Sequence, residues 1–173
     1  MALNFTTGMT QSSNADSVTN WAAYRISGSG GAPSAAADAV TYREGAGSIS
    51  ARISGASWDA GLIYDHYTGH SNVVLNLATS GNEVLAIWFL CTSPSAMAAL
   101  ASNGAYILVQ SSTETGTTAP TKYAKWTVLG SNVYPGGWVL LMIDTRKTPT
   151  TTAGGWTAGT DLALTRRIGI GLN

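Results

Sequence analysis

Apolar and polar residues alternate along most of the chain with the two-residue period of β-strands. In residues 48–53, for example, Ile49, Ala51 and Ile53 all fall on one side. Clusters of Gly, Ser, Asn and Pro separate such runs about every ten residues, a spacing typical of antiparallel sandwiches. Strands are predicted over residues 21–25, 39–43, 48–53, 58–64, 72–77, 83–90, 105–109, 122–128, 138–143 and 164–172. We therefore expect an all-β chain.

Three central runs are apolar on both faces: residues 83–90, 105–109 and 138–143. A strand of this kind must be covered on both sides. The opposing sheet supplies one cover. The other has to be a helix, a long loop or another subunit, because contiguous exposed apolar surface is costly.

One short helix is predicted directly after the first of these runs. Ser93 suits the N-cap, Pro94 the first helical position and Gly104 the C-terminal end. Met97 and Leu100 fall on one face of this helix. At about three turns, it can cover only part of the central strands, which leaves room for a partner.

Length and charge limit the organisation and the partners. The chain has 173 residues, which suits one domain. We predict an N-terminal arm over residues 1–18 and a single β-sandwich domain over residues 19–173. Nine basic and nine acidic residues cancel, so the positive field that attracts nucleic acid or anionic lipid is absent. The sequence predicts neither nucleic acid nor membrane as a partner.

The N-terminal sequence and the low charge together point to a particular setting. The first residues have neither the basic nor the apolar region of a signal peptide, and no apolar stretch has transmembrane length. Only 10% of the residues are charged, against about a quarter in typical soluble domains. We expect a protein made in a cytoplasm but exposed outside it. Phage virion proteins meet both conditions, because lysis releases them.

Groups for catalysis or metal binding are few. Cys91 stands in an apolar run and is predicted to be buried. Asp59 and Asp65 share a face of one predicted strand, but about 20 Å of strand separates them, too far for a catalytic pair. We interpret them as solvated carboxylates at strand ends, and Asp65, His66 and His70 as a polar loop with incidental histidines. The sequence therefore predicts no catalytic residue, no metal site, no cofactor and no enzymatic activity.

Two segments and their order resemble a known family. Residues 43–49 resemble the Gly-x-Gly-Ser-hydrophobic entry into a core strand, and residues 137–144 resemble a Gly-Trp-x-x-Leu-x-x-Asp strand. Asp161-Leu162 and then residues 167–170 follow. This order is similar to concanavalin A-like (laminin-G-like) jelly-roll domains, including those of carbohydrate-binding modules and phage structural proteins. The resemblance covers roughly residues 40–173 and implies an antiparallel jelly-roll β-sandwich.

The sequence departs from that pattern in two places. The Glu-x-Asp-x-x-Glu strand of the glycosidase members does not occur in the sequence. A further strand often follows the Ile-Gly-Ile segment, whereas this sequence stops at Asn173. Three explanations are open: the N-terminal strand closes the sandwich, a neighbouring chain completes it, or the sequence is a fragment.

Two functional hypotheses follow. The first is a structural protein of a phage virion, as a capsid decoration, head-fibre or tail-associated subunit that binds other virion proteins or copies of itself. Its candidate contact elements are residues 1–18 and the Thr-rich loop 148–160. The second is a carbohydrate-binding module that recognises a glycan, for example on a host surface, through the loop aromatics Trp156, Tyr67 and Tyr134. The remaining tryptophans fall in phase with apolar neighbours and are predicted in the core: Trp58, Trp88, Trp126 and Trp138.

Overall fold

The computed structural model describes residues 15–43, 45–52, 58–80, 83–111, 120–130 and 137–172, without the side chain of Trp58. Most of its regular structure is β. The elements, in chain order, are β1 (Trp21–Gly28), β2 (Ser34–Asp38), β3 (Ser48–Arg52), β4 (Trp58–Asp65), α1 (His66–Gly69), β5 (Val84–Phe89), α2 (Pro94–Asn103), β6 (Ala105–Ser111), β7 (Tyr123–Val128), β8 (Val139–Asp144), β9 (Thr151–Ala153), α3 (Ala158–Asp161) and β10 (Thr165–Leu172).

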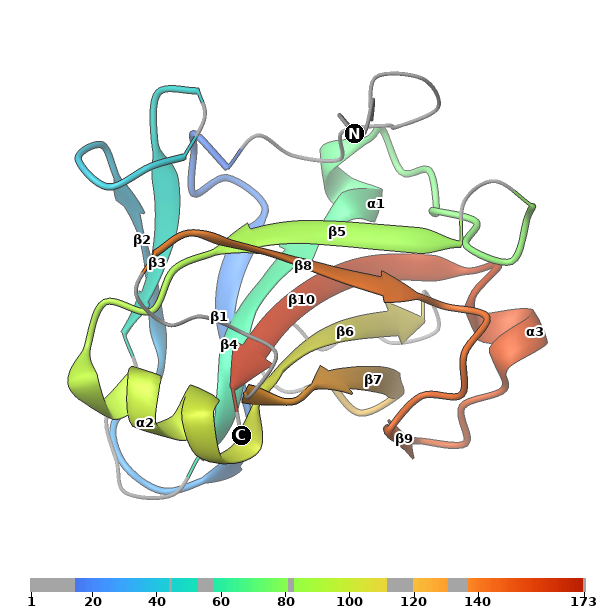
Figure 1. Ribbon diagram of the computed structural model, residues 1–173. Helices are drawn as coiled ribbons and strands as arrows, with labels where there is room; N and C mark the ends of the chain where they lie inside the picture. Colours follow the sequence, from blue (N-terminus) through green and yellow to red (C-terminus); the bar gives the residue numbers. More distant parts are fainter. Residues whose placement is uncertain are drawn as a thin grey trace, which may run out of the picture.

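A curled antiparallel sheet of six strands is the centre of the molecule (Figure 1). Its strand order is β1-β4-β10-β6-β7-β9. The last strand, β10, lies inside this sheet and pairs with β4 on one side and β6 on the other. β2 and β3 form a hairpin at one end, and β5 pairs with β8 in front of the sheet.

The first face of the six-stranded sheet carries the apolar core, over which β5 and β8 pack. Alternate residues of β6, β7 and β10 point into this core, as the two-residue period predicts. β5 and β8 contribute every second residue from the opposite side. The buried members are Leu77, Cys91, Leu100, Ala105, Ile107, Val109, Ala124, Trp126, Leu141, Ile143, Leu162 and Ile168. The predicted burial of Cys91 and Trp126 is confirmed.

The predicted helix is confirmed as α2. The side chain of Ser93 accepts a hydrogen bond from the Ala96 backbone N–H at 3.2 Å. Gly104 ends the helix with φ +81° and donates its N–H to the Leu100 carbonyl at 2.9 Å. Leu100 is buried in the core. The cap residues and the one apolar face therefore place α2 across the end of the core.

The second face of the six-stranded sheet combines tyrosines with glycines. Tyr24 on β1 and Tyr106 on β6 flank Gly61 and Gly171, which occupy the two strands between them. The two hydroxyl groups meet over this gap, where Tyr24 donates to Tyr106 at 3.0 Å. A Cβ atom on Gly171 would lie 2.4 Å from the Tyr106 hydroxyl and 2.7 Å from that of Tyr24. Gly171 of β10 thus makes the space in which the two tyrosine side chains meet, and Gly61 lets the β10 backbone approach β4 closely.

Predictions about the periphery were partly wrong. Residues 39–43 form bends, and the strand lies earlier, at β2, because the Asp38 carboxylate accepts from the backbone of Val40 and Thr41 and so starts a turn. Residues 72–77 contribute only the isolated bridge of Leu75 with Thr165. The segment 148–160 contains β9 and the start of α3. The described chain also has two single-turn helices, α1 and α3, beyond the one predicted.

The apolar side chains on the outer face of the β5–β8 pair were predicted to be buried, but several of them are partly exposed. Val84 is 53% exposed, Met142 43% and Trp88 38%, while Trp138 is half-buried. The Arg43 guanidinium lies 5.0 Å from the centre of the Trp88 ring. β6, in contrast, is buried on both faces within the chain. Of the three strands predicted to be apolar on both faces, β6 is covered within the described chain, whereas β5 and β8 leave apolar side chains partly exposed on their outer face.

Candidate functional site

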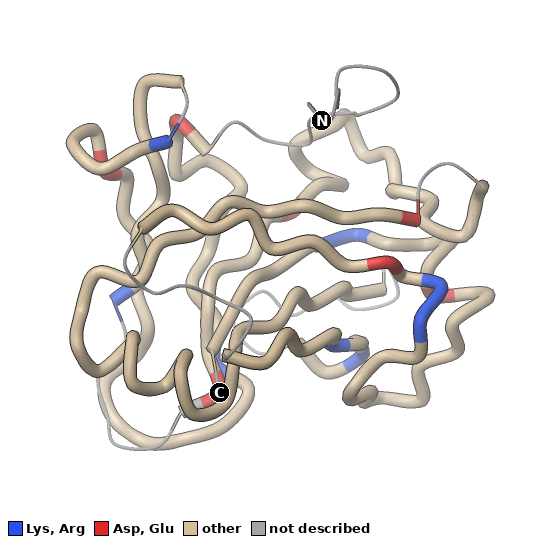
Figure 2. The backbone as a smooth tube through the Cα atoms, in the orientation of Figure 1, with Lys and Arg blue, Asp and Glu red and all other residues tan. Residues whose placement is uncertain are grey.

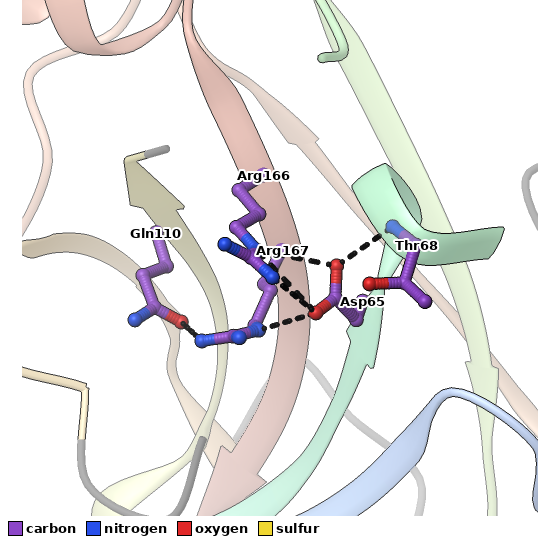
Figure 3. A network of polar contacts seen from close by, with 5 residues as sticks. All are labelled: Asp65, Thr68, Gln110, Arg166 and Arg167. Carbon is purple, nitrogen blue, oxygen red and sulfur yellow. Dashed lines mark hydrogen bonds and ion pairs between the residues drawn. The ribbon is translucent and has the colours of Figure 1, made fainter. Parts of the chain in front are cut away.

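Two arginines and one aspartate meet at one end of the second face (Figure 3). Asp65 ends β4, and its carboxylate accepts from Arg167 Nε at 3.1 Å and from Arg166 Nη2 at 3.2 Å. Arg167 Nη1 donates to the Gln110 side-chain oxygen on β6 at 3.3 Å. The Thr68 backbone N–H of α1 donates to the remaining Asp65 oxygen at 3.1 Å. We call Asp65, Thr68, Gln110, Arg166 and Arg167 the arginine cluster.

A β-bulge brings both arginines to the same carboxylate. Consecutive residues of a regular strand point to opposite faces, so only one of Arg166 and Arg167 should reach Asp65. The pairing of β10 with β6 shifts between Thr165 and Arg167, where three residues of β10 oppose two of β6. An extra residue of this kind re-aims the neighbouring side chains. The bulge therefore lets one aspartate hold two guanidinium groups.

Burial makes the geometry of this cluster well defined. The side chain of Arg167 is 2% exposed and that of Asp65 is 15% exposed. Burial alone would raise the pKa of Asp65. The hydrogen bonds from the Thr68 N–H and the Arg166 guanidinium lower the pKa by more than burial raises it, so the pKa lies below its usual value. Asp65 is thus held as a carboxylate. The prediction that it is a solvated strand-end group was wrong, because β10 places cations beside it.

A shallow pocket of about 310 Å³ adjoins the arginine cluster. The starts of β1 and α1 and the end of β4 form its wall, together with Arg167 of β10. Its lining residues are Asn20, Trp21, Ala22, Ile63, Asp65, Thr68 and Arg167. The pocket combines apolar side chains with fixed hydrogen-bonding groups, the composition of small-molecule sites.

The segment after Asp65 is a helical turn, and its histidines are not incidental. His66 is 6% exposed, and its ring stacks on that of His70 with centroids 4.1 Å apart. The buried Nδ1 atom of His66 makes no hydrogen bond. No group of three His, Cys, Asp or Glu residues suited to a metal ion occurs in the described parts of the chain.

His66 makes an acid-labile contribution to stability. Burial, and then the nearby His70, lower its pKa below the usual value. The unfolded chain therefore binds a proton more readily than the folded chain, and stability falls as the pH drops below about 6.5. We expect the free energy of unfolding in urea to decrease from pH 7 to pH 5. In His66→Phe this decrease should be largely absent, and an equal decrease in the variant would contradict the assignment.

A second ionic network lies at the other end of the same face. Lys125 of β7 donates to Asp59 of β4 at 2.5 Å, and Tyr106 donates to the other Asp59 oxygen at 2.5 Å. Lys125 Nζ also lies 4.4 Å from the centre of the Tyr106 ring. Burial raises the pKa of Tyr106 well above its usual value, so this hydroxyl remains a donor. Asp59, like Asp65, is half-buried and paired, and the prediction of a solvated carboxylate was wrong.

The structure separates the aromatic residues that the sequence proposed as a glycan platform. Trp156 precedes α3 and packs against the apolar core, with its indole Nε1 buried. Tyr67 lies in α1, where the Arg166 guanidinium is 5.0 Å from the ring centre. Tyr134 lies outside the described residues. Tyr67 therefore lies in α1 and Trp156 before α3, two helices that stand at separate places in Figure 1.

The arginine cluster was missed by the sequence analysis. The available signal was Arg167 itself, a charged residue in phase with the glycines of an otherwise apolar strand. A charge in such a position is buried only when it is paired. Its partner could not be identified from the sequence. The spacing of residues within β10 does not tell which residue of β4 lies opposite Arg167, or that β10 contains a bulge.

Comparisons with protein-family models, with curated proteins and with solved structures gave no match. None of the helices in the described residues is long and apolar enough to cross a membrane. The function therefore has to be argued from the surfaces and the site of this chain.

Proposed function

We propose that the chain is a non-enzymatic structural protein that works by association of subunits through the outer face of β5 and β8. The exposed apolar side chains of this face carry the proposal. Val84, Trp88 and Met142 would be buried against a partner, and contiguous apolar surface of this kind is common at protein interfaces. The partner is another copy of the chain or a second structural protein.

The charge distribution supports this choice of face. Figure 2 shows charged residues at one end of the β5–β8 pair, around Glu83 and Asp144, and none along the rest of the two strands. β5 has no charged residue, and in β8 only the last, Asp144, is charged. Interface centres are depleted of charged residues in the same way. Among the described strands, β5 and β8 pair only with each other, so their outer edges are also suited to further pairing.

The setting that we propose is a phage virion, and the overall architecture that we propose is a jelly-roll β-sandwich of the concanavalin A-like type. The virion setting is supported by the low charge of the sequence. The sandwich is supported by the packing of β5 and β8 over the apolar face of the six-stranded sheet. Capsid decoration, head-fibre and tail-associated positions are all compatible with association through one sheet face.

The proposal is tested by Val84→Lys, which places a charge on the outer face of β5. Residue 84 pairs with Asp144 of β8, so the new lysine has a carboxylate opposite it and the fold should tolerate it. We expect the unsubstituted chain to form a defined oligomer in sedimentation velocity at tens of micromolar. Val84→Lys should shift it to the monomer, with a dissociation constant raised at least tenfold.

Val73→Lys is the matched control, because Val73 is 58% exposed, close to the 53% of Val84, and lies in the segment after α1. The control should keep the oligomer. A monomeric unsubstituted chain that also fails to bind capsid or tail proteins would contradict the proposal. Equal effects of the two lysines would show that association uses another surface.

The alternative, glycan recognition through Trp156, Tyr67 and Tyr134, remains a prediction without comparable support. Trp156 contributes to the core and Tyr67 contacts Arg166. A glycan array would test it, with loss of the signal in Trp156→Ala as the expected result.

A further inference from the structure

We propose that two copies of the chain pair edge to edge through β5, antiparallel and about a two-fold axis at Ala86, so that their β5–β8 pairs form one sheet of four strands. This inference rests on the proposed association through β5 and β8, and it names the partner, a second copy, and the register. It is carried by the edge of β5, by the positions of its exposed side chains and by the placement of nearby charges.

The edge of β5 carries none of the features that keep strands apart. Among the described strands, β5 pairs only with β8. Its sequence, VLAIWF, has no charge, proline or glycine, and its pairing with β8 contains no bulge. Charges, prolines and bulges are the means by which edge strands avoid pairing with other chains. β8 differs, because its last residue, Asp144, is charged and Arg146 bonds to it. The edge of β5 is therefore better suited to a second chain.

The exposed side chains of β5 determine the register. Alternate residues of β5, beginning with Leu85, pack against the apolar core. The others, Val84, Ala86 and Trp88, point outwards. In an antiparallel pair, residues directly opposite each other share a face. A two-fold axis at Ala86 thus sets Val84 of each copy opposite Trp88 of the other, and Ala86 opposite its own counterpart.

This register accounts for the exposure of both large residues of the outer face of β5. Val84 is 53% exposed and Trp88 38% in the single chain. An aromatic residue opposite a β-branched one is a stabilising cross-strand pair, and the two-fold axis makes this pair twice. The side chain of Ala86 is small, so two copies can meet at the axis. A shift of two residues in either direction would remove both contacts between Val84 and Trp88.

The charges near β5 favour the antiparallel direction. The Arg43 guanidinium lies 5.0 Å from the centre of the Trp88 ring. The two-fold axis separates the two Trp88 residues by about 13 Å of strand. Each Arg43 then lies toward the end of the partner's strand pair that carries Glu83 and Asp144. A parallel pairing would instead bring the two guanidinium groups to the same end, where like charges repel.

The first experiment places a charge at the axis and compares it with the same charge one strand away. In Ala86→Lys two ammonium groups face each other across the axis, so we expect the dissociation constant in sedimentation velocity to rise at least about fivefold. Ala86→Gln adds a neutral side chain and should have a smaller effect. Met142→Lys is the matched control, because Met142 lies opposite Ala86 on β8, on the same outer face but away from the β5 edge. This control should keep the dimer.

The second experiment mixes two variants that carry opposite charges at the axis. Ala86→Lys and Ala86→Glu should each associate weakly alone, because like charges meet, whereas an equimolar mixture should associate at least as tightly as the unsubstituted chain. Only a residue that lies opposite its own counterpart gives this result. Circular dichroism and melting temperature establish that each variant is folded.

The outcomes separate this inference from the proposed function. Equal weakening by Ala86→Lys and Met142→Lys would show that the outer faces stack, which keeps the proposed function and overturns the edge pairing. A mixture that associates no better than its components would also overturn the pairing, as would a trimer, because a two-fold axis makes pairs. A monomeric unsubstituted chain would contradict the self-association on which both depend.

Discussion

Replacing Lys125 with methionine should lower the free energy of unfolding by about 3–5 kcal/mol, the usual cost of breaking a buried ion pair. The side chain of Lys125 is 6% exposed and that of its partner Asp59 is 17% exposed. Methionine preserves most of the volume but leaves the Asp59 carboxylate half-buried without its cation, while the Tyr106 hydroxyl still donates to it. Urea unfolding at pH 7 measures the loss.

Three further variants show that the loss comes from the charge: Asp59→Asn alone, its combination with Lys125→Met, and Arg146→Met. In the double variant Asp59→Asn/Lys125→Met the asparagine can still accept from Tyr106, and neither charge remains. Its loss should be smaller than the sum of the two single losses by about 1–3 kcal/mol. Arg146→Met removes a comparable pair with Asp144 at the surface, where Arg146 is 67% exposed, and should change stability little. Additive single losses would contradict the coupling.

Residue patterns were enough to predict the strands of the apolar face. Along β6, β7 and β10 every second side chain enters the core, and this alternation is visible in the sequence without knowledge of the partners. The caps of α2 were predicted for the same reason, since Ser93, Pro94 and Gly104 act on their own backbone neighbourhood. These features are local, and local chemistry determines them.

The second face could not be predicted, because its stability depends on which strands are neighbours. Lys125 is a charged residue next to Trp126 in β7, yet it is buried beside Asp59, 66 positions earlier in the chain. The glycines of β10 make room for tyrosines from β1 and β6, which lie far away in the sequence. The partner of Lys125 lies on β4, with β10 and β6 between the two strands.

The two faces therefore stabilise the sheet in different ways. The apolar face tolerates changes of residue type, because hydrophobic side chains of about the same total volume can fill a core when the apolar pattern is kept. The second face is specific to one register, since a shift of one residue would separate Asp65 from Arg167 and Asp59 from Lys125. We infer that the ionic networks select the strand order β1-β4-β10-β6-β7.

The substitution Asp65→Asn is expected to have the second large effect. It keeps the shape of the side chain and an acceptor for the Thr68 N–H, but it removes the charge that both Arg166 and Arg167 contact. We expect the free energy of unfolding at pH 7 to fall by about 3 kcal/mol, the lower end of the range for a broken buried pair, because Arg166 is partly exposed. Asp38→Asn is the control, since the Asp38 carboxylate lies in an exposed turn.

The pH dependence of this difference distinguishes the charge from mere packing. The pKa of Asp65 is lower in the folded chain than in the unfolded chain, so the unfolded chain takes up the proton first as the pH falls. The contribution of the carboxylate is complete above about pH 4 and is lost as the pH drops through the folded pKa. The gap in unfolding free energy between the unsubstituted chain and Asp65→Asn should therefore narrow from pH 5 to pH 2. A gap that stays constant over this interval would mean that Asp65 acts through its shape, and the two arginines would then need another explanation for their common position.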